Sequence, residues 1–245
     1  MEDKALLSTE VASGAEKAEL LIVIPAYNEA ENIERVVNHL TANFPQYDYV
    51  VVNDGSRDET AAICQRNGYN LLNLPVNLGL AGAFQAGLKY ADKYGYQYAV
   101  QLDGDGQHRP EYLESMIKKM EEGYDIVIGS RFVGEKKPFT MRMLGSNLIE
   151  MAIRFTTGVN IKDPTSGMRM FSKRMIREFA SGLNYGPEPD TVSYLIRQGA
   201  RVAEVPVIMD ERILGGSYLT PVNAMRYMLK MLISILLIQN FRKRR

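Results

Sequence analysis

The sequence predicts an α/β fold in which a mostly parallel central sheet carries helices on both faces. Short β-rich runs alternate with segments of helical spacing between residues 20 and 130. The runs are LLIVI (20–24), DYVVVND (48–54), YNLLNLP (69–75), YQYAVQLD (96–103) and YDIVIGS (124–130). Strand–helix alternation of this kind is typical of a parallel sheet covered on both sides.

The segments between these runs carry helix signals. In 30–44, Ile33, Val37 and Leu40 fall on one helical face with Val36. The segment 57–68 closes on a glycine, 78–95 is rich in small residues that pack closely on a sheet, and 110–123 has a proline in its first turn. Each of the first four strands is therefore followed by a predicted helix.

Composition limits the class of protein. The 245 residues, 46% hydrophobic and 24% charged, are enough for one sizeable globular domain. The formal net charge is zero, so no global field attracts nucleic acid, and we predict no nucleic-acid partner. We expect a mobile lead-in over 1–19, a main domain over 20–220 and a separate amphipathic helix over 221–245.

Cysteine usage and the start of the chain suggest a compartment. Cys64 is the only cysteine, which excludes an intrachain disulfide and a cysteine-based zinc site. The beginning of the sequence does not have the pattern of a signal peptide. We therefore expect a reducing, cytoplasmic location.

Common nucleotide-binding motifs are absent. The sequence has no G-x-x-x-x-G-K-[ST] loop, which leaves a P-loop unsupported. The first predicted strand is followed by PAYNE (25–29) rather than G-x-G-x-x-G, which leaves a dinucleotide-binding fold unsupported.

Carboxylates gather where the predicted strands end. Asp54 and Asp103 each end a strand, and Asp105 follows in the sequence DGDGQH (103–108). Ligands of parallel sheets bind at the carboxyl ends of the strands, and oxygen ligands of this kind suit Mg²⁺ or Mn²⁺ that carries a phosphorylated substrate. Gln107 adds one more oxygen, whereas His108 is more simply a supporting residue. The alternative is a polar turn, since Asp and Gly are turn formers.

Five motifs together resemble the family 2 glycosyltransferases of the GT-A fold. They are VIPAYNEAENI, VVNDGSRDET, NLGLAGAF, LDGDGQHRPE and IGSRF, and the resemblance covers roughly residues 20–220. Within that family, DGDGQH, GSRF and the late ERILGGSYL are most similar to the polyprenyl-phosphate glycosyltransferases.

The resemblance implies a site for a nucleotide-sugar donor. It implies that Pro25, Tyr27 and Glu29 line the nucleoside pocket. Val52 and Asp54 would contact the base or the ribose, and Asp103 and Gly104 would hold the ribose and the first phosphate. Asp105 and Gln107, with Asp103 beside them, would bind the Mg²⁺ or Mn²⁺ that bridges the diphosphate. Such an ion stabilises the charge on the departing diphosphate.

The resemblance also implies a cationic site for the acceptor. A phosphate monoester has a second pKa of about 6, so it is largely dianionic near neutrality and needs cations rather than a general base. The positions that match the acceptor-phosphate region are Arg131, Arg142, Ser146, Arg212 and Ser217. Arg131 and Arg212 are also expected to act in catalysis with Asp105.

Two features bear on the choice of acceptor and donor. Tyr218 stands where mannose-transferring members of the family often carry a lysine, which disfavours a GDP-mannose donor. Glu188 and Asp190 lie where members that use alcohol acceptors can carry the general base. If neither faces the acceptor, they are acids at a helix N-terminus, where the dipole favours them.

The C-terminal segment predicts an interfacial helix. A helix beginning after Pro221 is mostly apolar, and Asn223, Arg226, Lys230 and Ser234 form one narrow polar stripe. The uncharged run 231–241 is about half of the ~20 residues that a spanning helix needs. With the basic end RKRR (242–245), it suits the surface of an anionic membrane on its inner face. The alternative is a helix packed on the domain or on a second copy in a homo-oligomer.

The predicted function is transfer of a hexose from a UDP- or GDP-sugar to a polyprenyl phosphate, with inversion and with a divalent metal ion. One alternative is extension of a glycan at an alcohol hydroxyl. Another is a sugar-nucleotide pyrophosphorylase, which should carry an early glycine-rich loop that 25–35 lacks. The amphipathic segment 141–158 is a second candidate for contact with lipid.

Overall fold

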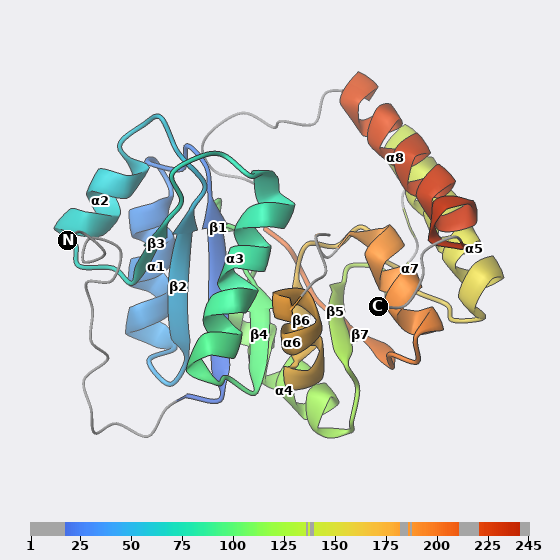
Figure 1. The fold of residues 1–245 in the computed structure, drawn as a ribbon, viewed down its shortest axis with the longest axis horizontal. Helices are drawn as coiled ribbons and strands as arrows, with labels where there is room; N and C mark the ends of the chain where they lie inside the picture. Colours follow the sequence, from blue (N-terminus) through green and yellow to red (C-terminus); the bar gives the residue numbers. More distant parts are fainter. Residues whose placement is uncertain are drawn as a thin grey trace.

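A seven-stranded mixed sheet forms the centre of the chain (Figure 1). The computed structural model describes residues 18–135, 137, 140–181, 186, 188–210 and 221–240. The strands are ordered β3-β2-β1-β4-β6-β5-β7 across the sheet. In chain order they are β1 Leu20–Ala26, β2 Asp48–Asn53, β3 Leu71–Asn73, β4 Tyr98–Gln101, β5 Ile126–Ser130, β6 Arg169–Ser172 and β7 Val202–Pro206.

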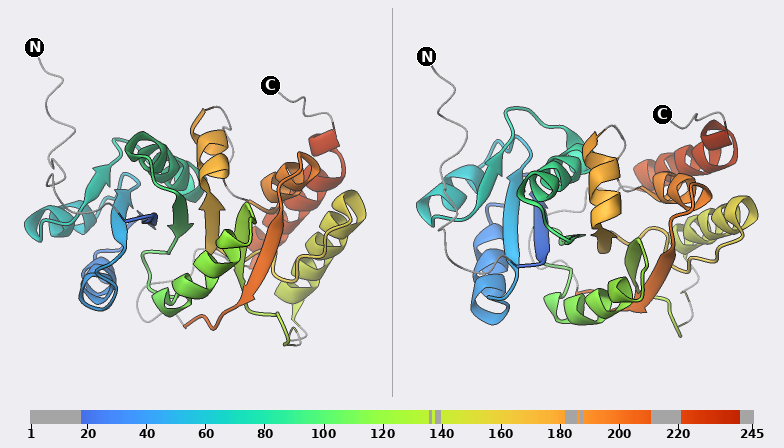
Figure 2. Two further views of the ribbon diagram at one scale, coloured as in Figure 1. Left: turned by 90° about the horizontal axis from the view of Figure 1, so that it is seen from below. Right: turned by 60° about the horizontal axis from the view of Figure 1, so that its bottom comes forward.

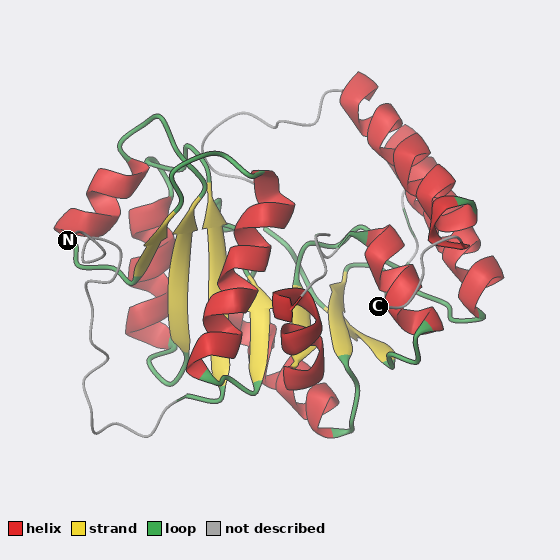
Figure 3. Cartoon of the chain, viewed as in Figure 1, coloured by secondary structure: helices red, strands yellow, loops and turns green. Residues whose placement is uncertain are grey.

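Helices alternate with the strands along most of the chain (Figure 3). In chain order they are α1 Ile33–Asn43, α2 Thr60–Arg66, α3 Gly79–Tyr94, α4 Leu113–Glu121, α5 Met141–Thr157, α6 Lys173–Ser181, α7 Pro189–Arg197 and α8 Pro221–Leu236. Short 3-10 helices occupy Pro110–Tyr112 and Ile238–Asn240. Seen along the sheet, α3 and α6 lie on one face, and α1 and α4 lie on the other (Figure 2).

The predicted fold class is confirmed, with one addition. β3, β2, β1 and β4 are parallel neighbours, and β5 is parallel to β7. β6 runs antiparallel between β4 and β5, so the sheet is mixed. Neither β6 nor β7 is predicted from the sequence, because four- and five-residue strands give too short a pattern to stand out from their surroundings.

The side chains of β1 show how the sheet builds two cores. Leu21 and Val23 pack with Phe84 of α3 in one apolar cluster. Ile22 and Ile24 point to the opposite face and pack with residues of α1, α2 and α4. Alternation by two along a strand sends successive side chains to opposite faces, and burial of each large apolar side chain contributes about 1.5–3 kcal/mol. Apolar packing therefore covers both faces of the sheet, and polar functional residues are expected at the ends of the strands.

The helices α5, α7 and α8 form a group beyond β5 and β7. α8 packs against both α5 and α7, and Figure 1 shows α5 and α8 side by side, away from the sheet. The predicted C-terminal helix is present but ends at Leu236, where a short 3-10 helix follows. The expected lead-in lies almost wholly outside the described residues, which begin at residue 18.

Candidate functional site

Three loops meet at the carboxyl ends of β1, β2 and β4. The backbone N–H of Asp54, just after β2, donates to the carbonyl of Ala26 at the end of β1 (2.9 Å). A Cβ atom on Gly104, after β4, would lie 3.1 Å from the carbonyl oxygen of Pro25. The parallel sheet thus brings together the motifs around residues 25, 54 and 104, as the sequence analysis expected.

The loop after β1 is held by the loop after β2. Asn28 has a positive φ of 55°, and its side-chain oxygen accepts from the backbone N–H of Arg57 (2.9 Å). The backbone N–H of Glu29 donates to Oγ1 of Thr60 (2.9 Å). Glu29 is itself buried, and its Oε2 accepts from Nδ2 of Asn32 (2.8 Å). Tyr27, also predicted to line the nucleoside pocket, is half-buried beside them.

The two residues predicted to contact the base or ribose have different surroundings. Asp54 is almost fully buried, and its Oδ1 accepts from the backbone N–H of Leu78 at the start of α3 (2.7 Å). A carboxylate there complements the positive end of the helix. Val52 is fully buried in the core that includes Phe84, so its side chain belongs to the core rather than to a ligand surface. Strand alternation explains this, because a residue inside β2 must face one of the two cores.

Asp103 is the more exposed of the two carboxylates after β4, with 31% of its side chain accessible. Its Oδ1 accepts from Nε2 of Gln101 (2.7 Å). Its backbone N–H donates to Nδ1 of the buried His108 (3.0 Å), so the neutral ring carries its proton on Nε2, which lies 3.7 Å from Oδ2 of Asp103. His108 therefore orients Asp103 rather than presenting a nitrogen to a ligand.

Asp105 is held from two directions. Its Oδ1 accepts from the backbone N–H of Gln107 (3.0 Å), and its carbonyl accepts from Nη2 of Arg35 in α1 (3.1 Å). Nε2 of the Gln107 side chain donates to the carbonyl of Asp210 (3.1 Å). The side-chain oxygen, Oε1, is left as the atom that could serve as a ligand. The loop 103–109 is thus fastened both to α1 and to the segment after β7.

The donor set suits a hard cation shared with a substrate. Among the described residues, no group of three or more His, Cys, Asp or Glu side chains is placed to hold a metal ion by itself. Mg²⁺ and Mn²⁺ commonly take one or two carboxylates, and their other ligands are waters and phosphate oxygens. Asp103 and the mostly buried Asp105 fit this pattern, because they offer carboxylate oxygens where the loops after β1, β2 and β4 meet.

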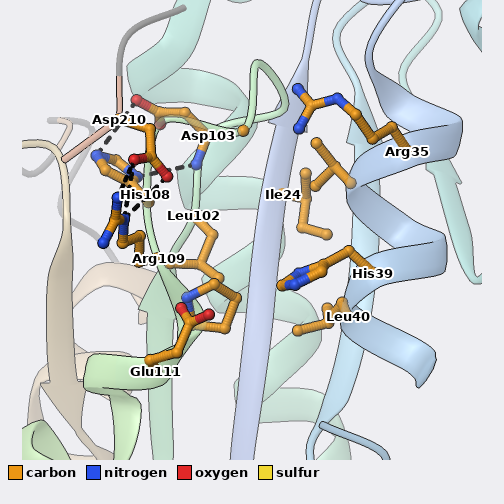
Figure 4. Close-up of a pocket in the computed structure, with 13 residues that line it drawn as sticks. Ile24, Arg35, His39, Leu40, Leu102, Asp103, His108, Arg109, Glu111 and Asp210 are labelled. Carbon is orange, nitrogen blue, oxygen red and sulfur yellow. Dashed lines mark hydrogen bonds and ion pairs between the residues drawn. The ribbon is translucent and has the colours of Figure 1, made fainter. Parts of the chain in front are cut away.

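A pocket lies between α1 and the segment 102–111 (Figure 4). Arg35 and His39 face it from α1, and Asp103, His108 and Arg109 face it from the opposite wall. Its volume of about 250 Å³ is below the roughly 300–1,000 Å³ typical of ligand sites, so it is too small to hold a nucleotide-sugar alone.

Arg131, at the end of β5, is paired with a buried carboxylate. Its Nε and Nη2 donate to the two oxygens of Asp163 (2.7 and 2.8 Å), and its backbone N–H donates to the same group (3.1 Å). Asp163 has no exposed surface. This aspartate is not predicted from the sequence, since it follows no strand and belongs to none of the five motifs. The positive charge of Arg131 is balanced by the negative charge of Asp163, so the net positive charge at this position is lower than predicted.

The other predicted acceptor residues do not form a described cluster. Ser146 of α5 is fully buried, and its Oγ has no hydrogen-bond partner within the described part of the chain. Arg142 lies in the first turn of α5, and its side chain is outside the described part. Arg212 and Ser217 also lie outside the described residues, as does Tyr218.

Glu188 and Asp190, at the start of α7, face the C-terminal helix. Glu188 accepts from the hydroxyl of Tyr227 (2.5 Å), and burial raises the pKa of that tyrosine well above its usual value. Asp190 accepts from Oγ of Ser234 (2.6 Å) and from Nε2 of Gln239 (3.2 Å). Both carboxylates therefore fasten α8 to α7.

The polar stripe predicted for the C-terminal helix is divided between two environments. Ser234 is buried against Asp190, whereas Arg226 and Lys230 are exposed. The outer surface of α8 also carries exposed apolar side chains, and α5 carries a matching set. They are Met225, Leu229, Ile233 and Leu236 on α8, and Leu144, Leu148, Met151 and Phe155 on α5. None of the described helices is long and apolar enough to cross a membrane.

Sequence comparison finds a matching family and relatives about 30% identical over most of the chain. The model of the family described as Glycosyl transferase family 2 matches residues 21–180. Polyprenol monophosphomannose synthase of Mycolicibacterium smegmatis is 31% identical, over 86% of this chain and 84% of that protein. Undecaprenyl-phosphate mannosyltransferase of Micrococcus luteus is 31% identical, over 81% and 86%. UDP-N-acetylglucosamine–dolichyl-phosphate N-acetylglucosaminyltransferase of Methanococcus voltae is 30% identical, over 77% and 84%.

Structure comparison agrees on the fold. Glucosyl-3-phosphoglycerate synthase from Mycobacterium tuberculosis, solved with Mn²⁺, UDP and glucosyl-3-phosphoglycerate, matches with a TM-score of 0.65. The match covers 90% of this chain and 79% of that chain at 20% sequence identity. At this identity the likeness concerns the fold and not the substrate.

Proposed function

Because this chain belongs to glycosyl transferase family 2 and has the GT-A fold, we propose that it transfers a sugar from a nucleoside diphosphate sugar to a polyprenyl phosphate. It is a glycosyltransferase by family, and the finer proposal concerns its donor, its acceptor and its metal ion. The proposed use of a nucleotide-sugar donor rests on Asp103 and Asp105, which lie where the loops after β1, β2 and β4 meet.

The proposed metal ion is Mg²⁺ or Mn²⁺, held by Asp103 and Asp105 with the amide oxygen of Gln107. When bound, such an ion stabilises the charge that develops on the departing diphosphate. The protein's own part is to hold these oxygens in place: His108 and Gln101 orient Asp103, and the backbone of Gln107 orients Asp105. The structurally similar synthase crystallised with Mn²⁺ is consistent with this choice.

The proposed acceptor is a phosphate. The names of the relatives support it, and so do the hydrogen bonds that occupy Glu188 and Asp190 at the start of α7. Two relatives are named for polyprenol or undecaprenyl phosphate and one for dolichyl phosphate. In the proposed step, an oxygen of the acceptor phosphate attacks the anomeric carbon. The bond from that carbon to the diphosphate breaks, and the diphosphate leaves with the electron pair, so the configuration inverts. The attacking phosphate needs no general base.

The alternative acceptor, an alcohol, has less support. It requires a carboxylate free to accept a proton, and the two candidates from the sequence are Glu188 and Asp190. Both accept hydrogen bonds from α8 or the turn that follows it. The pyrophosphorylase alternative is disfavoured because the chain belongs to a transferase family.

The proposal is tested by offering the purified full chain UDP- and GDP-sugars with undecaprenyl phosphate, Mn²⁺ or Mg²⁺, and detergent. We expect one donor to yield a metal-dependent glycolipid that is labile to mild acid, as a sugar phosphate linkage is. A matched reaction uses undecaprenol, which lacks the phosphate, as the acceptor. Product from undecaprenol and none from the phosphate would favour the alcohol acceptor and contradict the proposal.

We also infer that the outer face of α5 and α8 rests on an anionic membrane surface. The exposed fractions of Phe155 and Met225 are 85% and 67%, which is unusual for large apolar side chains. The charges around this face are mostly positive. Arg154, Arg226 and Lys230 are exposed, and the one acid of α5, Glu150, is paired with Lys137 and Lys162. An apolar face with a cationic border suits anionic lipid better than another protein surface of neutral net charge.

This surface is tested by sedimentation of the full chain with vesicles of phosphatidylcholine, with and without phosphatidylglycerol. We expect Phe155→Glu with Leu229→Glu to lower the partition coefficient by at least about tenfold, since each side chain loses about 1.5–3 kcal/mol of apolar burial. Val76→Glu, an exposed apolar position outside α5 and α8, is the matched control. Unchanged partition would contradict this inference. A dimer that the double variant converts to monomer without loss of lipid binding would instead assign this face to a second copy.

A further inference from the structure

All the polar groups of Asp210, four residues beyond β7, are bonded to the segment after β4. Its backbone N–H donates to the carbonyl of Gln107 (2.9 Å), and its own carbonyl accepts from Nε2 of Gln107 (3.1 Å). Its carboxylate accepts from Nε of Arg109 at 2.9 Å to each oxygen, and from Nη2 of the same guanidinium. Residues about a hundred positions apart are thus joined through both backbone and side chains, and Figure 4 shows the Arg109–Asp210 pair.

These bonds lead directly to Asp105. Gln107, whose carbonyl and side-chain amide are both bonded to Asp210, also has the backbone N–H that donates to Oδ1 of Asp105 (3.0 Å). On the opposite side, Arg35 holds the carbonyl of Asp105 (3.1 Å). Figure 4 shows Arg35 and Arg109 on opposite sides of the pocket, with the guanidinium of Arg109 beside Asp210. The carboxylate of Asp105 is therefore placed by a clamp whose outer part is the Arg109–Asp210 pair.

The Arg109–Asp210 pair contributes little to the stability of the fold. The two side chains are 40% and 43% exposed, and ion pairs open to water are weak because water screens them. The bonds from Arg109 hold the pKa of Asp210 below its usual value, so the pair stays charged at neutral pH. Its bidentate geometry nevertheless defines an orientation, which a single contact to lysine would not.

We propose that Arg109 and Asp210 are positioning residues for the metal–diphosphate site, acting through Gln107 on Asp105. The inference rests on the proposed function, because it assumes that Asp105 is a metal ligand. Residues that orient metal ligands typically change metal affinity by about 10–100-fold when they are replaced. We therefore expect a loss of metal affinity that exceeds any loss of fold stability.

The test measures Mn²⁺ binding to the full chain, with UDP and separately with GDP, by Mn²⁺ electron paramagnetic resonance and titration calorimetry. Arg109→Met and Asp210→Asn should each weaken Mn²⁺ binding by about 10-fold or more while the melting temperature stays near that of the wild type. The exchanged pair, Arg109→Asp with Asp210→Arg, should recover part of the affinity. Transfer assays should show a higher Mn²⁺ requirement with the same rate at saturating Mn²⁺.

A matched control lies at the opposite edge of the sheet. Arg174 and Asp125 form a similar bidentate pair, from Nε to Oδ1 at 2.8 Å and from Nη2 to Oδ2 at 2.5 Å. Arg174→Met removes a pair of the same kind and should leave Mn²⁺ binding unchanged.

The outcomes separate the inference from the proposed function. No Mn²⁺ binding by the wild type with either nucleotide would contradict the metal site itself. Wild-type binding that survives Arg109→Met and Asp210→Asn would overturn the positioning role. An equal loss of Mn²⁺ affinity in Arg174→Met would also overturn the positioning role, since the loss would then come from general destabilisation.

Discussion

The two halves of the sheet handle their polar residues differently. At the carboxyl ends of β1, β2 and β4, the loops that follow successive strands bond to one another, and the residues of three short motifs meet. Around β5, β6 and β7, the polar residues pair with partners that do not lie at the end of a strand. Arg131 pairs with Asp163, and Asp190 bonds to Ser234, 44 residues away.

The difference shows which part of a site a motif can describe. In the first half, each polar residue lies beside the end of its own strand, so strand order alone brings the motifs together. In the second half, a polar residue can be exposed or buried according to which helix covers it. Ser146 is buried under such a contact, whereas Arg226 is exposed on the helix that packs against α5.

The largest loss of activity is expected at Asp105, in the first half. Asp105→Ala removes a proposed metal ligand from the half with preassembled loops, so transfer should fall by about 10²–10³-fold while the fold stays intact. Steady-state rates over a range of Mn²⁺ concentration, together with circular dichroism, check this. Near wild-type rates at ordinary metal concentration would remove Asp105 from the metal site.

An intermediate effect is expected at Asp190, at the start of α7 in the second half of the molecule. Asp190→Asn should lower the free energy of unfolding by about 1–3 kcal/mol, because it weakens buried bonds to Ser234 and Gln239. The rate per folded molecule should change much less than the roughly 10²–10⁴-fold expected for loss of a general base. Glu188→Gln, which disturbs the bond to Tyr227, should behave alike. A loss of that larger size in either variant would revive the alcohol acceptor.

An effect on stability of comparable size is expected at Gly55, where two loops of the first half touch. Gly55 has a φ of +63°, and a Cβ atom there would lie 2.8 Å from the backbone nitrogen of Asn77. Gly55→Ala should cost roughly 2–4 kcal/mol in urea unfolding, from the left-handed backbone and the overlap together.

Gly68 supplies the comparison for that variant. Its φ is +66°, but nothing lies within 4 Å of the added atom, so Gly68→Ala should cost only the backbone part, about 1–2 kcal/mol. Equal costs at the two positions would mean that the contact between the loops after β2 and β3 is not tight.

Much of the first half could be predicted from sequence, and the reason is local. The alternation of β-rich runs and helical segments, with Asp54 and Asp103 at strand ends, predicted the parallel strands and the place of the carboxylates. The antiparallel β6 was not predictable in this way, because its four residues have no neighbours in sequence that reveal their partners β4 and β5.

By itself, the sequence determined the fold class, the edge at which Asp103 and Asp105 lie, and the amphipathic character of α5 and α8. These depend on the order of residues along one element and on the turn that follows it. Only the tertiary structure decided that Asp163 neutralises Arg131, that Ser234 is buried while Lys230 is exposed, and that Asp210 clamps Gln107. Such contacts depend on which faces of distant elements meet, and no spacing within one segment records that choice.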